Sequence, residues 1–154
     1  MYGDIKKKHK SKEEDPYNPS SPYSASKASG DLLIKSYIRT YKIPAIITNC
    51  CNNFGPNQYP EKLIPLSIIK LMAGKKIQIY GNGLNIRDWL HVKDHCEGIF
   101  LALTKGRSGA VYNFGADSEK TNLEIADVIL HQMGLNQSSI EFVADRLGHD
   151  LRYS

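Results

Sequence analysis

Short apolar runs alternate along this chain with longer segments in which apolar residues recur at helical spacing. The runs with strand character are Pro44–Thr48, Ile77–Tyr80, Ala110–Phe114 and Ile140–Val143. The helical segments run from Pro22 to about Arg39, from Leu63 to Met72, from Val92 past Leu103 and from Asn122 to about Met133. Strands that alternate with helices of about ten residues or more predict an α/β fold with parallel sheet. We expect the run at 44–48 to be buried on both faces, as parallel strands usually are.

Capping residues support these helix boundaries. Ser21-Pro22 combines an N-cap serine with a proline at the first helical position. Thr121 and Glu124 have the spacing of a capping box, and Gly74 is suited to closing the helix before it. The segments 1–20 and 51–60 are rich in charged residues, Asn, Gly and Pro, and are predicted as loops.

Charge and hydropathy exclude several classes of protein. The net charge of +4 comes largely from one basic run, Lys6, Lys7, Lys8, Lys10 and Lys12. A solvated loop is the favoured interpretation of this run over a nucleic-acid site, because no aromatic residues interleave it and no nucleic-acid-binding motif follows. The polar N-terminus does not resemble a signal peptide, and no apolar stretch approaches the roughly 18 residues that cross a bilayer. The cysteines lack metal-ligand spacing, so we expect reduced thiols in a cytoplasmic protein without a membrane partner.

Tyr23 and Lys27 stand four positions apart on the first predicted helix, so their side chains share one face. A phenol is a poor base at neutral pH because its ordinary pKa is about 10, but a nearby ammonium favours the phenolate. Such a pair can take a proton from a sugar hydroxyl while a hydride leaves for a nicotinamide. Taken alone, the same spacing also fits an amphipathic helix with an exposed lysine.

Several motifs together resemble one enzyme family. They are Ser21–Lys27, Asn52–Pro56, Tyr59–Pro65, Ile86–Leu90 and Asp145–Asp150. The first two resemble the catalytic helix and the following loop of the extended short-chain dehydrogenases, and the others are similar to the dTDP-glucose 4,6-dehydratases. The resemblance implies the C-terminal half of a Rossmann-type enzyme with its substrate-binding subdomain. Residues 1–50 would end the NAD-binding part, and residues 51–154 would mainly bind a nucleotide sugar.

The resemblance also implies individual roles. Tyr23 would be the redox base, Lys27 would hold the nicotinamide ribose of NAD, and Asn53 would lie near the cofactor. The residues implied to bind the nucleotide sugar are Asn52, Lys62, Leu63, Gln78, Tyr80, Arg87, Asn122, Arg146 and His149. The planar fork of an arginine suits a diphosphate, and a tyrosine ring can stack against a base.

Structural alternatives remain open for some of these residues. Arg87 is equally compatible with an ion pair to Asp88 or another carboxylate, and Asn122 lies inside the predicted capping box. Trp89 is more typical of a core residue than of a ligand contact. The histidines form no cluster, so no metal site is predicted, and His149 is the histidine for which we expect a role.

The implied reaction is redox-neutral. Tyr23 and NAD would oxidise carbon 4 of the glucose, water would be lost across carbons 5 and 6, and the hydride would return to carbon 6. A nucleotide-sugar epimerase or decarboxylase of the same superfamily is the alternative enzyme, although the run Pro60–Leu63 favours the dehydratase. A truncated domain that binds a nucleotide sugar without turnover is the non-enzymatic alternative. Full-length members of the family are usually homodimers.

The chain departs from the family pattern in ways that bear on activity. The family's glycine-rich phosphate loop and its acidic elimination residues, which precede the pair here seen as Tyr2-Gly3, are not among these 154 residues. Leu147 and Gln78 each replace a frequent proline. A dinucleotide is normally anchored by its phosphates at a helix N-terminus. We therefore expect the isolated chain to bind NAD weakly or not at all and to show no dehydratase activity.

Overall fold

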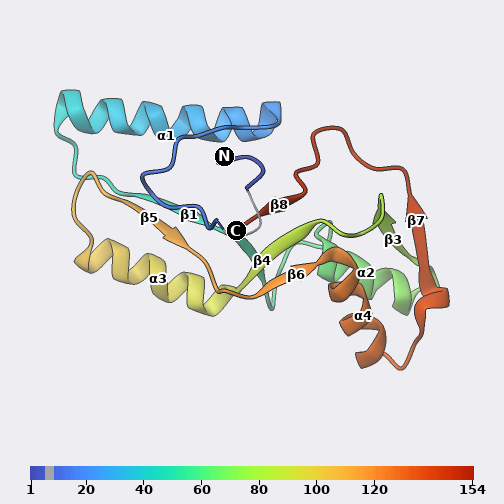
Figure 1. The fold of residues 1–154 in the computed structure, drawn as a ribbon. Helices are drawn as coiled ribbons and strands as arrows, with labels where there is room; N and C mark the ends of the chain where they lie inside the picture. Colours follow the sequence, from blue (N-terminus) through green and yellow to red (C-terminus); the bar gives the residue numbers. More distant parts are fainter. Residues whose placement is uncertain (6–8) are drawn as a thin grey trace.

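The structure is a computed structural model that describes residues 1–5 and 9–154. One region of it is built around two parallel strands. Strand β1 (Ile47–Cys50) pairs with β5 (Val111–Phe114), so that Ile47 lies opposite Val111. Helices α1 (Pro22–Tyr41) and α3 (Val92–Lys105) lie on opposite sides of these strands (Figure 1). This arrangement is the α/β layering that the sequence predicts.

A second, smaller region contains another parallel pair. Strand β3 (Ile77–Tyr80) pairs with β7 (Ile140–Val143), and helices α2 (Leu63–Met72) and α4 (Asn122–Gln132) pack beside them. A short 3₁₀ turn at Gln137–Ser139 leads into β7. In Figure 1 this region lies at the opposite end of the molecule from α1 and α3.

A third group of strands joins the two regions. Strand β4 (Ile86–His91) pairs in parallel with β2 (Asn52–Phe54) and β8 (Arg152–Tyr153), and antiparallel with β6 (Glu119–Thr121). Strand β4 therefore pairs both with β2, which directly follows β1 of the first region, and with β8 near the C-terminus. Side chains on β4 are therefore held at the junction between the regions.

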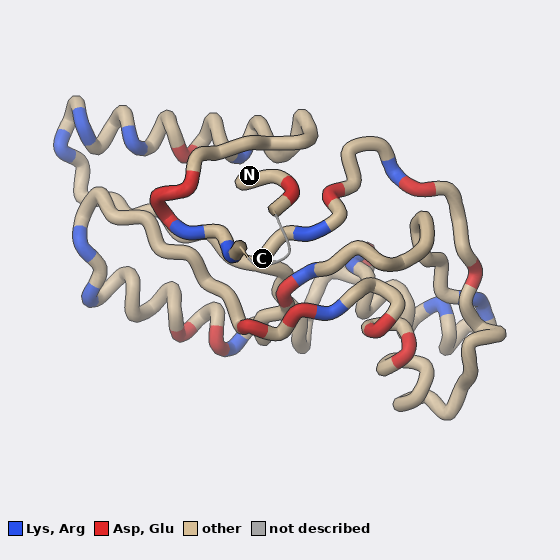
Figure 2. The backbone as a smooth tube through the Cα atoms, viewed as in Figure 1, with Lys and Arg blue, Asp and Glu red and all other residues tan. Residues whose placement is uncertain are grey.

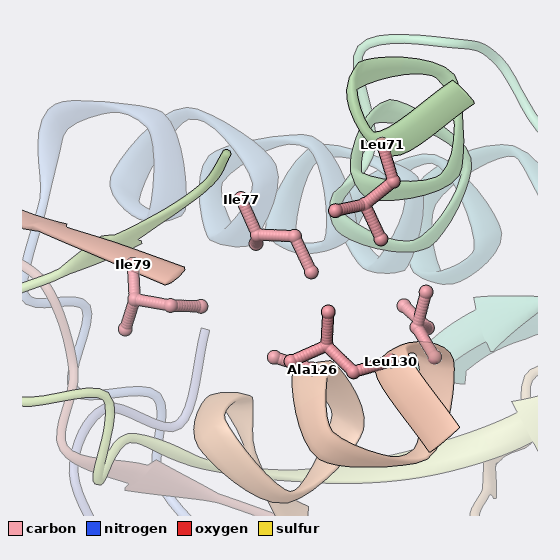
Figure 3. Close-up of a cluster of buried hydrophobic side chains, with 6 residues drawn as sticks. Leu71, Ile77, Ile79, Ala126 and Leu130 are labelled. Carbon is pink, nitrogen blue, oxygen red and sulfur yellow. The ribbon is translucent and has the colours of Figure 1, made fainter. Parts of the chain in front are cut away.

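The apolar core of the smaller region lies between its helices and strands. Its buried residues are Leu71, Ile77, Ile79, Ala126, Ile129 and Leu130. Ile77 and Ile79 are each 1% exposed and point from β3 toward α2 and α4 (Figure 3). Alternate residues on a strand face opposite sides, so Gln78 and Tyr80 face away from this core.

The N-terminal segment and β8 are tied together by charged side chains. The guanidinium of Arg152 donates to both carboxylate oxygens of Glu119 and to the backbone carbonyl of His9, and Asp4 accepts the Arg152 N–H. Lys10 forms an ion pair with Asp117. Figure 2 shows acidic and basic positions interspersed in this central part of the fold. Lys6, Lys7 and Lys8 of the basic run lie outside the described residues.

Most elements expected from the sequence are confirmed. The bounds of α2, β3 and β7 agree with the prediction, and the capping box at Thr121 and Glu124 is formed. Gly74, with φ of 68°, follows the end of α2 as expected. Trp89 is 6% exposed, which confirms it as a buried residue.

Two expectations about strands are wrong. The run 44–48 is not buried on both faces: β1 starts at Ile47, Pro44 is exposed, and Ile47 is the buried residue of the strand. The reason is that the described sheet there holds only β1 and β5, which leaves β1 at an edge. The segment 51–60 is not entirely loop, because it contains β2, whose polar residues pair with β4.

Removal of the Thr121 hydroxyl should destabilise the fold modestly. Thr121 Oγ1 accepts the Glu124 N–H at 3.1 Å, and Glu124 Oε2 accepts the Thr121 N–H at 2.7 Å. We expect Thr121→Ala to lower the free energy of unfolding by about 1 kcal/mol, measured with urea. Thr104→Ala is the control, because the Thr104 hydroxyl donates to the carbonyls of Phe100 and Leu101 within α3 and caps no helix end. Equal losses in the two variants would contradict a capping role for Thr121.

Candidate functional site

A cleft of about 1400 Å³ lies where the two regions meet, and its walls include the start of α1, strand β2, the start of α2 and the C-terminal loop. Every site residue expected from the sequence lines it: Tyr23, Lys27, Asn52, Asn53, Lys62, Leu63, Gln78, Tyr80, Arg87, Asn122, Arg146 and His149. Pockets for one drug-sized molecule usually measure about 300–1,000 Å³. The cleft therefore has room for more than one ligand.

The start of α1 brings Tyr23 and Lys27 to the cleft. Ser21 is the N-cap, and its Oγ accepts the Ser24 N–H at 3.2 Å, which fixes the first turn of the helix. Tyr23 is 74% exposed, so its phenol is open to the cleft. Hydrogen bonding to Glu61 raises the pKa of Lys62, and the charge of Tyr23 adds a smaller contribution in the same direction. The ammonium of Lys62 thus lies within electrostatic range of the Tyr23 phenol.

Strand β2 contributes two asparagines, Asn52 and Asn53, to the lining of the cleft. Asn53 Nδ2 donates to the Cys50 sulfur at 3.2 Å, and the Asn53 backbone carbonyl accepts from Gln58 Nε2 at 2.8 Å. Asn53 Oδ1 is buried and receives no hydrogen bond from any described residue. A buried acceptor without a donor costs free energy, so this oxygen is suited to a ligand N–H.

The first turn of α2 offers a positive helix end to the cleft. Its N-cap, Lys62, makes no side-chain capping bond to the backbone N–H groups of this turn. Unsatisfied N–H groups at a helix start favour anions. Farther along the same wall, Lys70 Nζ donates to Gln78 Oε1 at 2.7 Å. The wall therefore combines helix amides with lysine side chains, as expected for an anionic ligand.

The C-terminal loop contributes a group of linked polar residues. The Arg146 guanidinium lies over the Tyr80 ring, 4.9 Å from its centroid, and Arg146 Nη2 lies 3.3 Å from His149 Nε2. Asp145 Oδ1 lies 2.7 Å from His149 Nδ1, and this hydrogen bond is the largest cause that lowers the pKa of Asp145. Because Arg146 covers one face of Tyr80, stacking of a base on Tyr80 remains a prediction for the opposite face.

Arg87 makes contacts that neither interpretation of its sequence position anticipates. It is 5% exposed, and its guanidinium donates to the backbone carbonyls of Ile86 at 2.6 Å, Asp150 at 2.7 Å and Leu151 at 3.3 Å. Burial lowers the pKa of Arg87. The alternative of an ion pair with Asp88 or another carboxylate is wrong, because Arg87 donates to these carbonyls and the Asp88 carboxylate accepts the N–H groups of Ala116 and Ser118. Arg87 therefore anchors the C-terminal segment while it also lines the cleft.

Two further cleft residues were not identified from the sequence. Asp88 is 2% exposed and accepts the N–H groups of Ala116 at 2.8 Å and Ser118 at 2.7 Å. Burial raises the pKa of the neighbouring Cys51 to about 12, and Asp88 adds to this effect. Tyr153 also lines the cleft, although no local pattern marks it. The signal for Asp88 was its position between Arg87 and Trp89 in a recognised motif.

The described residues hold no group of three or more His, Cys, Asp or Glu side chains placed to bind a metal ion. Within the same residues, no helix combines the length and apolar character needed to span a membrane.

Comparison with known proteins identifies close relatives. Residues 1–115 match the NAD dependent epimerase/dehydratase family. The chain is 52% identical over 139 residues to a dTDP-glucose 4,6-dehydratase of an Actinoplanes species, covering 90% of this chain and 43% of that protein. The crystal structure of a Bacillus anthracis dTDP-glucose 4,6-dehydratase in complex with NAD superimposes with a TM-score of 0.94 at 51% identity. It covers 99% of this chain and 49% of that one.

A second solved structure is also similar to this chain over nearly its whole length. A dTDP-glucose 4,6-dehydratase of Streptomyces venezuelae, with NAD and TYD bound, has a TM-score of 0.96 and 49% identity. The match covers 99% of this chain and 47% of that one. The chain thus spans less than half the length of each of these relatives.

Proposed function

Because the chain belongs to the NAD dependent epimerase/dehydratase family, we propose that it is the nucleotide-sugar-binding part of a dTDP-glucose 4,6-dehydratase. One observation carries the proposal. Residues suited to redox chemistry and residues suited to a nucleotide sugar come from distant parts of the sequence and line the same cleft. Identities of about 50% to two dehydratases support this choice of activity within the family.

The residues at the α1 and β2 side of the cleft fit the nicotinamide end of NAD. Tyr23, Lys27 and Asn53 would hold it, and the buried Asn53 Oδ1 lacks a donor among the described residues. NAD supplies a reversible hydride acceptor when it is bound. The phenol of Tyr23 takes the proton from the sugar hydroxyl as carbon 4 is oxidised, and it returns the proton later.

The remaining cleft residues bind and orient the nucleotide sugar. The start of α2, Lys62 and Arg146 provide positive charge for a diphosphate. Gln78 and Asn122 provide neutral hydrogen-bonding groups on the walls. This division leaves the sugar between the diphosphate contacts and Tyr23, as the reaction requires.

We propose a cytoplasmic enzyme that forms a homodimer. Helix α1 supports the homodimer, because it has an exposed apolar face. Leu33, Tyr37 and Tyr41 recur every four residues on this face and are 60%, 49% and 67% exposed. An apolar helix face of this kind is typical of a protein interface.

The activity can be tested in a joined enzyme, defined as residues 1–154 preceded by the nucleotide-binding half of the Actinoplanes relative. We expect it to convert dTDP-glucose to the 4-keto-6-deoxy product in the presence of NAD, measured by mass spectrometry as loss of water. The unmodified Actinoplanes enzyme is the positive control. A product of unchanged mass with inverted carbon 4 would instead favour an epimerase. Normal binding of dTDP-glucose without any conversion would favour a non-catalytic binding domain.

A further inference from the structure

Tyr153, on β8, contacts two of the residues proposed to bind the nucleotide sugar. Its hydroxyl donates to Asn52 Oδ1 on β2 at 2.5 Å. Its ring lies under the guanidinium of Arg87 on β4, with the guanidinium carbon 4.2 Å from the ring centroid. The Tyr153 side chain therefore links Asn52 on β2 with Arg87 on β4, two residues that lie 35 positions apart in the sequence.

The hydrogen bond to Asn52 has a defined direction. Burial raises the pKa of Tyr153 above its ordinary value near 10, so the phenol is protonated at neutral pH and acts as the donor. A carboxamide has one oxygen that accepts and one nitrogen that donates two hydrogen bonds. Because Tyr153 occupies the oxygen, the Asn52 side chain turns its N–H₂ group away from Tyr153.

The Asn52 amide nitrogen is consequently available to a ligand. No described residue accepts a hydrogen bond from this nitrogen, and Asn52 lines the cleft. An N–H₂ group pairs with oxygen acceptors such as those of a phosphate or a sugar hydroxyl. Without the Tyr153 hydroxyl, the amide could rotate by half a turn and present its oxygen to the same ligand.

The contact of Tyr153 with Arg87 fixes the orientation of a second residue proposed to bind the ligand. Three of the five N–H donors of a guanidinium are used by the carbonyls of Ile86, Asp150 and Leu151. The aromatic ring beneath the guanidinium keeps its plane in place by cation–π attraction. The donors that remain are therefore presented in a constant orientation.

We infer that Tyr153 is a positioning residue for the nucleotide sugar, which sets the Asn52 amide with its N–H₂ toward the ligand and holds the plane of Arg87. This inference rests on the proposed function, because it requires the cleft to bind a sugar nucleotide. It assigns a role to the C-terminal strand beyond completing the sheet. It also assigns the chemistry of the contact: Asn52 recognises an oxygen acceptor of the ligand.

The experiment measures the affinity of the 154-residue chain for dTDP-glucose by calorimetry. Tyr153→Phe keeps the ring beneath Arg87 and removes only the hydroxyl. We expect it to weaken binding roughly 3- to 10-fold. In an Asn52→Ala background the same substitution should cause no further loss, because the oriented amide is already absent. Asn52→Asp should weaken binding more than Asn52→Ala, since it replaces the donors with a negative charge.

Tyr2→Phe is the matched control. The Tyr2 hydroxyl also donates to an asparagine Oδ1, that of Asn113, at 3.2 Å. Asn113 has no proposed role in binding, so we expect unchanged affinity in this variant. Thermal unfolding of both Phe variants without ligand measures any purely structural effect, which should be similar in the two.

Each result bears on the inference. The inference is supported if Tyr153→Phe loses affinity while Tyr2→Phe does not. It also requires that Tyr153→Phe cause no further loss in the Asn52→Ala background. Three results would each overturn the inference while the proposed function stands. They are wild-type affinity in Tyr153→Phe, wild-type affinity in Asn52→Asp, and a loss from Tyr153→Phe that is as large in the Asn52→Ala background as in the wild-type chain. If the wild-type chain does not bind dTDP-glucose, the inference and the proposed binding role of this cleft both fail.

Discussion

Tyr23→Phe is expected to lower kcat of the joined enzyme about 10²- to 10⁴-fold, the usual contribution of a positioned general base. The substitution removes only the phenol oxygen. Because Tyr23 is 74% exposed, its ring contributes little to packing in this part of the fold, and Phe should be accommodated at the same place. The KM for dTDP-glucose should change little, since the residues that bind the nucleotide sugar are unaltered. Initial rates of formation of the 4-keto product test both statements.

Tyr59→Phe is the control for this experiment. Tyr59 is similarly exposed, at 68%, and it is not among the residues that line the cleft. We expect a near-normal rate in that variant. A near-normal rate in Tyr23→Phe would show that another group takes the proton from the sugar.

Arg87→Lys should impair both stability and ligand binding. Lysine keeps the positive charge, but its single ammonium cannot span the three carbonyls that the guanidinium contacts, nor lie flat on Tyr153. A hydrogen bond from a charged donor contributes about 1.5–3 kcal/mol, although Asp150 O and Leu151 O keep other donors, Asn85 Nδ2 and the Ile86 N–H. We expect the free energy of unfolding of the chain to fall by about 2–4 kcal/mol, measured with urea. Affinity for dTDP-glucose should fall tenfold or more, because the fork is lost as well.

Arg146→Lys is the matched control in the same cleft. Arg146 is itself exposed and contacts the side chains of Tyr80 and His149, whereas the buried Arg87 holds backbone carbonyls. We therefore expect it to weaken ligand binding with a much smaller loss of stability. NAD affinity of the joined enzyme should hardly change in either variant, because the proposed cofactor contacts lie at Tyr23, Lys27 and Asn53. Lower stability of Arg87→Lys with unchanged affinity for dTDP-glucose would make Arg87 purely structural.

Local sequence alone determined the elements whose stability comes from short-range interactions. Helix α2, strands β3 and β7, and the capping box at Thr121 were predictable because capping residues and apolar periodicity act over a few residues. The residues that line the cleft were identified in another way, through short motifs that resemble one enzyme family. Their roles in binding and catalysis remain proposals.

Tertiary structure alone decided the strands that meet at the centre of the molecule. Strand β2 is polar, and β8 has two residues whose partners on β4 lie 66 positions earlier, as in the pair Ile86 and Arg152. No local pattern marks such strands, because their backbone hydrogen bonds are satisfied only by distant segments. For the same reason the sequence did not reveal that Arg87 donates to the carbonyls of Asp150 and Leu151, or that Tyr153 contacts Asn52. Hydrogen bonds to the backbone depend on where a distant chain segment passes, and that path exists only in the folded protein.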